Sequence, residues 1–165
     1  WQLTVRSLLE GRAEPNQINA QNGTFPLLLA GGNGHADSLM SLLEDRAEPN
    51  QINPQTDAFP LLLAAENGHA DCVRSLLEGR AEPNQINAQN GSFPLLLAAQ
   101  NGHADSVTSL LDGRAEPNQI NAEDGNFPLL LASYNGHADS VRSLLEGRAE
   151  PNQIDAQNGS FPLLL

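Results

Sequence analysis

Apolar runs alternate with polar loops along this chain, and both recur at a fixed step of 34 residues. The run Phe-Pro-Leu-Leu-Leu begins at Phe25, Phe59, Phe93, Phe127 and Phe161. The polar sequence Asn-Gly-His-Ala-Asp begins at Asn33, Asn67, Asn101 and Asn135. A third marker, Arg-Ala-Glu-Pro-Asn-Gln-Ile, has the same step from Arg12 to Arg148. Three markers with one period indicate an array of structural repeats.

We divide the chain into units that each start one residue before the phenylalanine. Four units are complete: 24–57, 58–91, 92–125 and 126–159. Residues 1–23 correspond to the end of an earlier unit, and residues 160–165 correspond to the beginning of another. We therefore interpret residues 1–165 as a single repeat array that is a segment of a longer one.

The unit at 92–125 predicts two helices. Pro94 suits the first helical position, where the N–H that proline lacks has no partner. The apolar run after it extends for two turns to Gly102, which can adopt the left-handed conformation that ends a helix. A second helix is expected from about residues 103–105 to near Gly113. Its apolar residues fall on one face; they are Ala104, Val107, Leu110 and Leu111.

An extended loop follows the second helix. Pro117 prevents further helix, and Asp124-Gly125 is a signal for a tight turn. Two short helices and a loop cannot bury an apolar face alone, whereas stacked copies can.

This unit resembles the ankyrin repeat. The matching motifs are Pro94-Leu95, Ala98-Ala99, Gly102-His103, Leu110-Leu111 and Ala115-Glu116-Pro117-Asn118. The resemblance implies an all-α, ankyrin-like α-solenoid of stacked helix-turn-helix units joined by extended hairpin-like loops. It also implies a non-enzymatic scaffold that binds a protein partner on the concave face formed by loop tips and first helices.

The chain departs from the family pattern in three ways. The period is 34 instead of 33, and a phenylalanine replaces the threonine that caps the first helix. We expect Phe25, Phe59, Phe93 and Phe127 to be buried wedges between units. The glycine after the second helix is displaced, as in Gly113-Arg114, so either the helix ends one residue early or arginine adopts a left-handed conformation. The unit at 24–57 has Pro54 and Asp57 where other units have alanine and glycine, and we expect it to be the least regular.

Charge narrows the function classes. The chain has 8 Lys+Arg, all of them arginine, against 20 Asp+Glu, which gives a formal net charge of −12. Such a chain is a poor ligand for nucleic acid or anionic lipid, since both require excess cation. The single cysteine, Cys72, permits no internal disulfide, and no apolar run approaches the ~20 residues that a transmembrane helix needs. We expect an intracellular, cytoplasmic protein in a reducing compartment.

No residue pattern indicates catalysis, a metal or a cofactor. The histidines recur once per unit, but stacked helical layers lie roughly 8–10 Å apart, too far for neighbours to share a zinc ion at about 2 Å. We expect them to tie helix ends to adjacent loops, as in the family; they are His35, His69, His103 and His137. Asp71 and its equivalents favour helix starts. Glu44, Glu48 and their equivalents are expected to pair loosely with Arg12 and its equivalents.

Positions that differ between units are the candidate partner-binding residues. On the family's concave face these are Glu66, Gln89, Asn90, Ser92, Gln100, Glu123, Asp124, Asn126 and Tyr134. A second series of varying residues is expected on the outer face; it comprises Met40, Arg74, Thr108 and Arg142. Tyr134 is the only tyrosine, and two interpretations stay open for it: a binding hot spot, or a ring packed over Ala132 or a neighbouring loop.

The acidic tips favour a partner with a basic surface. The alternative is a structural spacer or a self-assembling array segment of a larger protein. Residues 1–10 resemble a second helix without its first, and Phe161–Leu165 the start of a first helix without its second. These half-units are complementary, so head-to-tail self-association is a further hypothesis.

Overall fold

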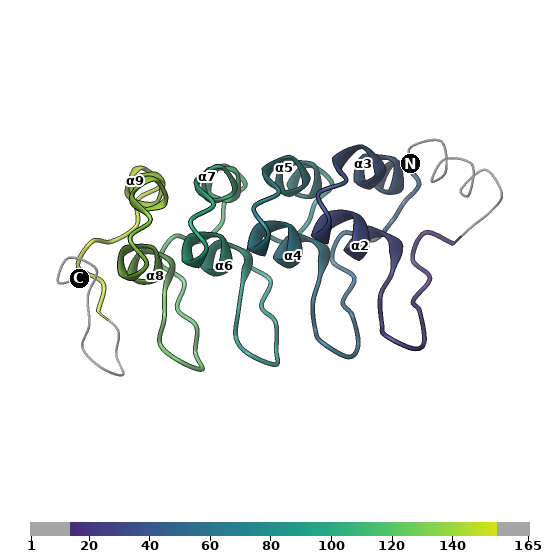
Figure 1. The fold of residues 1–165 in the computed structure, drawn as a ribbon, viewed down its shortest axis with the longest axis horizontal. Coiled ribbons are helices and arrows are strands. Elements are labelled where there is room, and N and C mark those ends of the chain that lie inside the picture. Colours follow the sequence, from purple (N-terminus) through teal and green to yellow (C-terminus); the bar gives the residue numbers. More distant parts are fainter. Residues whose placement is uncertain (1–13, 155–165) are drawn as a thin grey trace.

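The computed structural model describes residues 14–154, and in this range the chain forms four helix pairs (Figure 1). The first helices of the pairs are α2 (Pro26–Gly32), α4 (Pro60–Glu66), α6 (Pro94–Gln100) and α8 (Pro128–Tyr134). The second helices are α3 (Ala36–Glu44), α5 (Ala70–Glu78), α7 (Ala104–Asp112) and α9 (Ala138–Glu146). The expected half-units at residues 1–10 and 161–165 lie outside the described residues.

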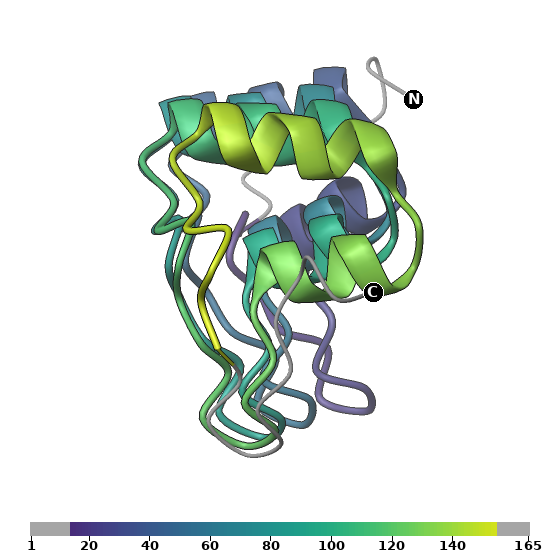
Figure 2. The same cartoon turned by 90° about the vertical axis from the view of Figure 1, so that its left-hand side faces the viewer.

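The helices form two parallel rows. Each first helix packs against the next first helix, each second helix against the next second helix, and the two helices of a pair against each other. The loops that join the pairs all project from the row of first helices on the side away from the second helices (Figures 1 and 2). This arrangement confirms the predicted all-α solenoid, and no strand is assigned within residues 14–154.

The first helices begin as the sequence predicts. The residue before each helix is the unit's phenylalanine, in an extended conformation and without a side-chain cap, and proline follows it. All four phenylalanines are buried and belong to one apolar core that continues through every unit. Burial of the ring therefore replaces the hydrogen bond that a capping threonine would make.

Three of the four second helices in the described range, α5, α7 and α9, end on a glycine for a packing reason. Gly113 has φ −78°, which any residue can adopt. A Cβ added to Gly113 would lie 2.6 Å from Cδ1 of Leu77 in the preceding unit, and a Cβ at Gly147 equally close to Cδ1 of Leu111. The glycine therefore makes room for a leucine of the neighbouring unit.

The left-handed residue is the arginine that follows. Arg46, Arg80, Arg114 and Arg148 all have φ between 68° and 69°. Of the two alternatives that the sequence left open, arginine in the left-handed region is therefore the correct one. This conformation costs a residue with a Cβ about 1 kcal/mol.

The unit at 24–57 is more regular than we expected. Asp57 adopts φ 52° at the position where Gly91 has φ 69°. Its N–H donates to the carbonyl of Asn53 at 2.9 Å, as that of Gly91 does to Asn87 at 2.9 Å. The expectation of an irregular loop is wrong because aspartate tolerates the left-handed region better than most residues.

Cys72, Ser106 and Ser140 occupy equivalent, fully buried positions in the second helices. The hydroxyls of Ser106 and Ser140 have no hydrogen-bond partner. A buried hydroxyl without a partner is destabilising, whereas a thiol behaves as a small apolar group.

The first prediction concerns the left-handed arginines. Arg114→Gly should raise the free energy of unfolding by about 1 kcal/mol, because glycine adopts positive φ without steric cost. Arg142→Gly, at an exposed position inside α9, should lower it by about 1 kcal/mol. Urea unfolding followed by circular dichroism measures both. An Arg114→Gly protein no more stable than the parent would mean that the left-handed arginine is not strained.

The second prediction exchanges the buried thiol and hydroxyl. Ser106→Cys should stabilise the protein and Cys72→Ser should destabilise it, each by on the order of 1 kcal/mol. The two variants make the same chemical change in opposite directions at equivalent sites. Urea midpoints measured under reducing conditions should therefore shift in opposite directions, and shifts of the same sign would contradict the assignment.

Candidate protein-binding surface

Asparagine side chains position the loops by linking each unit to the next. The side-chain oxygen of Asn84 accepts the backbone N–H of Glu116 at 2.8 Å, and Asn50 accepts that of Glu82 at 2.8 Å. Asn16 and Asn118 make the same contact with the following unit. Each of these bonds joins residues 32 positions apart in the sequence. A backbone N–H of one unit is therefore held by a side chain of the preceding unit.

The loop tips are held in the same manner. Asn87 and Asn121 are buried, and each donates its side-chain N–H to a tip carbonyl of the preceding unit, that of Thr56 at 2.9 Å and that of Asn90 at 3.1 Å. Gln89 also donates its side-chain N–H to the carbonyl of Gln55 at 2.9 Å. The tips therefore form a connected row.

The histidines fix the ends of the first helices. Nε2 of His103 lies 3.0 Å from the carbonyl oxygen of Glu66, and Nε2 of His137 lies 3.0 Å from that of Gln100. Because a carbonyl only accepts, Nε2 carries the proton. The structural role predicted for histidine is confirmed, although the partner is a helix end of the preceding unit and not a loop.

Three of the predicted partner-binding residues lie at the ends of first helices. Glu66, Gln100 and Tyr134 are the last residues of α4, α6 and α8, and all three side chains are exposed. Tyr134 is 71% exposed, so its ring does not pack over Ala132 or over the loops within residues 14–154. The next unit holds the backbone at Glu66 and Gln100, while all three side chains are accessible to another molecule.

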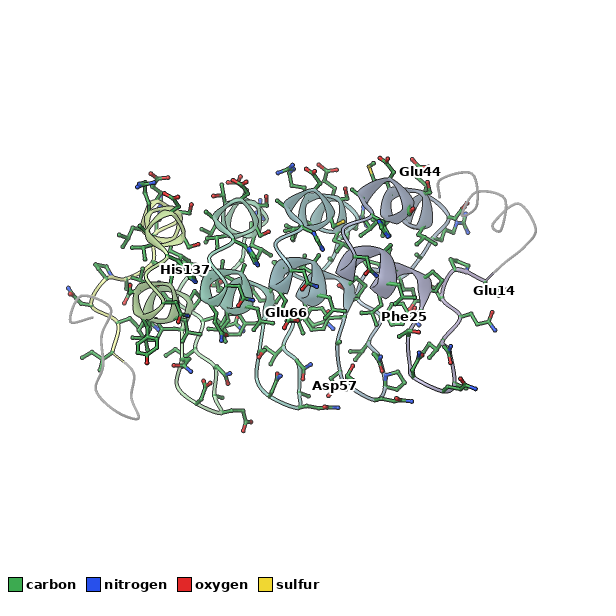
Figure 3. The ribbon with its side chains drawn as sticks, viewed as in Figure 1. Glu14, Phe25, Glu44, Asp57, Glu66 and His137 are labelled. Carbon is green, nitrogen blue, oxygen red and sulfur yellow. The ribbon has the colours of Figure 1, made fainter. Side chains whose placement is uncertain are left out.

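The other predicted residues lie on the loops. Gln89, Asn90, Glu123 and Asp124 are exposed at the tips. Ser92 and Asn126 are half-buried where the chain returns to the first helix, and Asn126 donates its side-chain N–H to the Asp124 carboxylate at 2.8 Å. Figure 3 shows how the ends of the first helices lie relative to the loop tips. Glu66 is at the end of α4, and Asp57 is at the tip of the loop before that helix.

The charges on this surface have one sign. In the described residues, the first helices and loop tips carry acids but no arginine. The acids at these positions are Asp57, Glu66, Glu123 and Asp124, and the arginines lie on second helices or directly after them. A positively charged group that reaches this surface therefore meets no like charge among the described residues.

One exposed series is the same in every unit and is therefore not among the predicted residues. Isoleucine occupies the same loop position in each unit and is 40–58% exposed; the residues are Ile18, Ile52, Ile86, Ile120 and Ile154. We call this series the isoleucine column. A search for positions that vary between units cannot find a residue that never varies. The usable signal was an apolar residue between polar ones, in Gln-Ile-Asn or Gln-Ile-Asp, in a segment that proline excludes from helix.

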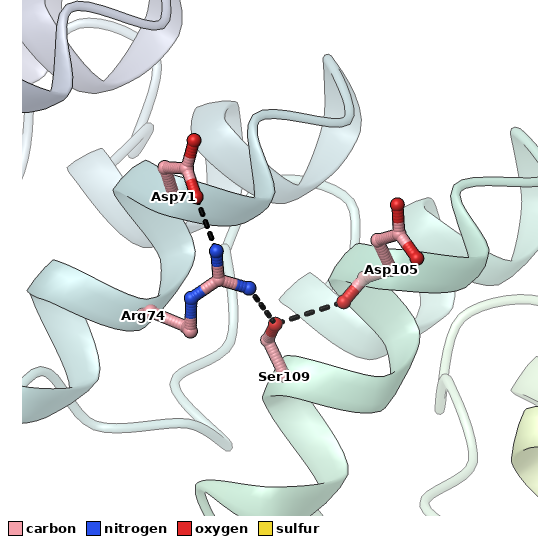
Figure 4. Close-up of polar contacts among 4 residues, drawn as sticks. All are labelled: Asp71, Arg74, Asp105 and Ser109. Atoms are coloured by element: carbon pink, nitrogen blue, oxygen red, sulfur yellow. Dashed lines mark hydrogen bonds and ion pairs between the residues drawn. The ribbon is translucent and has the colours of Figure 1, made fainter.

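The outer face carries the second varying series, as predicted, since Met40, Arg74, Thr108 and Arg142 are exposed on second helices. Figure 4 shows Arg74 of α5 paired with Asp71 and, at 3.4 Å, with the hydroxyl of Ser109 on α7. Arg142 pairs with Asp139 at 2.7 Å. These exposed pairs contribute little to stability.

The loose pairing expected between the unit arginines and the glutamates is wrong for the described residues. Among them, Arg46, Arg80, Arg114 and Arg148 form no ion pair with Glu44, Glu48 or their equivalents. Both charges are exposed and are hydrated individually, which costs less side-chain entropy than pairing.

Cys72 is unsuited to nucleophilic chemistry. Its side chain is buried, and burial, followed by the negative charge of Asp71, raises the pKa of the thiol from 9.0 to about 11. The thiolate is the nucleophilic form, so almost none is present at neutral pH. Within residues 14–154, no three His, Cys, Asp or Glu side chains are placed to hold a metal ion. In the same range, every helix is too short or too polar to cross a bilayer.

Comparison with known proteins agrees with this geometry. A family model described as ankyrin repeats (3 copies) matches residues 2–87 and residues 61–155. The chain belongs to the ankyrin repeat family. Ankyrin repeats are generally protein-interaction modules and are generally not enzymes. No curated protein matches the chain.

The third prediction tests the asparagine links of this ankyrin array. Asn84→Ala should speed amide hydrogen exchange at Glu116, because its N–H loses the only acceptor that holds it across the unit boundary. The amide of Glu82, which Asn50 binds, serves as an internal control and should keep its rate. Asn90→Ala removes a contact within one loop only and should leave Glu116 protected. Unchanged exchange at Glu116 would show that the link does not order the loop.

Proposed function

We propose that this protein is a scaffold that binds a protein partner on its concave face, the surface formed by the loop tips and the first helices. The observation that carries the proposal is the exposed row at the ends of α4, α6 and α8. The backbone carbonyls of Glu66 and Gln100 accept hydrogen bonds from the next unit, and the side chains of Glu66, Gln100 and Tyr134 are exposed.

A fixed backbone with exposed, varying side chains is favourable for binding. Because the row is already ordered, association does not incur the entropy cost of ordering a loop. Tyr134 contributes a large ring with few rotatable bonds, the residue type that is enriched at binding hot spots. Invariant residues build the scaffold, and the residues that differ between units distinguish partners.

The partner that fits best has a basic surface. Acids without arginine on the loop tips and first helices attract cationic groups and speed their encounter with this face. Intracellular location and the absence of enzymatic activity belong to the same proposal.

The fourth prediction separates a binding scaffold from a spacer. Glu66→Arg combined with Tyr134→Ala should abolish capture of the partner from a lysate of the source cells. Both positions are exposed, so the fold should be unaffected, which circular dichroism checks.

The matched control is Met40→Ala combined with Thr108→Arg, which makes comparable changes on the outer face and should capture the partner as the parent does. Salt should weaken capture, because part of the attraction is electrostatic. Equal capture by all three proteins, or none by any, would favour the spacer.

A further inference from the structure

Asparagine is followed directly by glycine at two places in the repeat unit. One pair ends the first helix, as in Asn101-Gly102, and the other lies at the loop tip, as in Asn90-Gly91. The glycine nitrogen of such a pair can attack the side-chain amide carbon of the asparagine, and glycine has no Cβ to obstruct the approach. Because the two pairs have the same chemistry in sequence, only their surroundings in the fold distinguish them.

The fold holds the asparagines at the helix ends away from this reaction. The side-chain N–H of Asn101 donates to the carbonyl oxygen of Glu66 in the preceding unit at 3.0 Å. The equivalent asparagines of the units before and after make the same bond at 3.0 Å. Gly102 is itself packed against the next unit, since a Cβ built on it would lie 2.6 Å from Nδ1 of His137. Both reacting groups are therefore restrained by neighbouring units.

At the loop tips the asparagine side chain is turned onto its own backbone. Oδ1 of Asn90 accepts the N–H of Ser92 at 3.0 Å, which places the amide beside the Gly91 nitrogen that lies between them in the chain. Oδ1 of Asn22 accepts the N–H of Thr24 at 3.1 Å and also its hydroxyl at 2.8 Å. Both asparagines are exposed, and their Nδ2 groups donate to no other described residue. The nitrogen that must leave is therefore unrestrained.

The hydrogen bonds at Oδ1 favour the transition state of the attack. When the glycine nitrogen adds to Cγ, negative charge develops on Oδ1, and a donor already aimed at this oxygen stabilises that charge. The same bonds hold the reacting groups close together, which lowers the entropy cost of bringing them into contact. Asn22 has two such donors and Asn90 has one.

The reaction requires only water. The Gly91 nitrogen loses its proton to solvent and bonds to Cγ of Asn90, the bond from Cγ to Nδ2 breaks, and Nδ2 takes up a proton and leaves as ammonia. One water molecule then opens the resulting five-membered succinimide. Opening at Cγ gives aspartate, and opening at the backbone carbonyl carbon gives isoaspartate, in which the chain continues through Cγ.

The next unit shows that the aspartate product fits the loop tip. Asp124 occupies the position of Asn90, and its Oδ1 accepts the N–H of Asn126 at 3.0 Å, as Asn90 accepts that of Ser92. Isoaspartate adds a methylene to the backbone and displaces the carbonyl of residue 90, which accepts the side-chain N–H of Asn121 at 3.1 Å. One product therefore preserves the link to the next unit, and the other breaks it.

We propose that Asn22 and Asn90 are sites of spontaneous deamidation, with the following glycine as the nucleophile, and that Asn67, Asn101 and Asn135 are protected by the preceding unit. Each event replaces a neutral amide at a loop tip by a carboxylate, so the negative charge of the loop tips increases with the age of the protein. The proposal does not depend on the proposed function.

The fifth prediction compares the two kinds of site within one peptide. Cleavage after arginine releases residues 81–114, which contain both Asn90-Gly91 and Asn101-Gly102. After the folded protein has been kept for several weeks at slightly alkaline pH, fragmentation of this peptide in a mass spectrometer locates each deamidation. Asn90 should react at least about tenfold faster than Asn101, because only Asn101 must break a hydrogen bond to the preceding unit and only Asn90 has a donor at Oδ1.

Unfolded protein provides the control. In concentrated guanidinium chloride both sites should react at similar rates, because both are Asn-Gly pairs and neither retains its hydrogen bonds. Equal rates at Asn90 and Asn101 in the folded protein, or faster reaction at Asn101, would overturn the proposal. So would an Asn90 that stays intact in the folded protein while the unfolded protein reacts.

Two hydroxyl deletions test the role of Oδ1. Thr24→Val removes the hydroxyl that donates to Asn22 and should slow deamidation of Asn22 several-fold. Ser92→Ala is the matched control, because at Asn90 the donor is the backbone N–H, and its rate should not change. Circular dichroism verifies that both variants are folded. A rate at Asn22 that Thr24→Val leaves unchanged would contradict the stabilisation of charge at Oδ1.

Discussion

The junction between neighbouring units is the interaction on which the structure depends. A pair of helices of seven and nine residues is too short to be stable alone in water. It becomes stable because each junction buries a phenylalanine, leucines and alanines in a core that continues through every unit. Around this apolar core, asparagine, glutamine and histidine side chains satisfy backbone groups of the adjacent unit. The junction therefore supplies both the burial and the hydrogen bonds that a single unit lacks.

Backbone details away from the core follow from the same constraint. The second helix ends on glycine because a Cβ at Gly113 would collide with Leu77 of the unit before it. The left-handed position then falls on Arg114, at an energetic cost, one residue later than the glycine. A local backbone preference is thus given up for contact between units, since that contact contributes more to stability than one relaxed dihedral angle.

Much of the fold could be predicted from the sequence because the signals are repeated in each unit. Proline at a helix start, Asn-Gly at its end and the apolar stripe of the second helix set the element bounds to within a residue or two. The links through Asn84 and Asn87 were not predicted, since an exposed-looking amide in a loop gives no sign of which unit it contacts. The regularity of the loop at Asp57 was missed for a different reason, because aspartate adopts the left-handed region at a lower cost than most residues with a Cβ. The varying site residues were found by comparing units, and the isoleucine column was missed by the same comparison because it does not vary.

These two kinds of surface residue have different consequences for recognition. A side chain that changes from unit to unit, as from Glu66 to Gln100 to Tyr134, can select one partner and fix its position along the array. A side chain that is the same in every unit, as in the isoleucine column, offers equal contacts at each step and cannot fix that position.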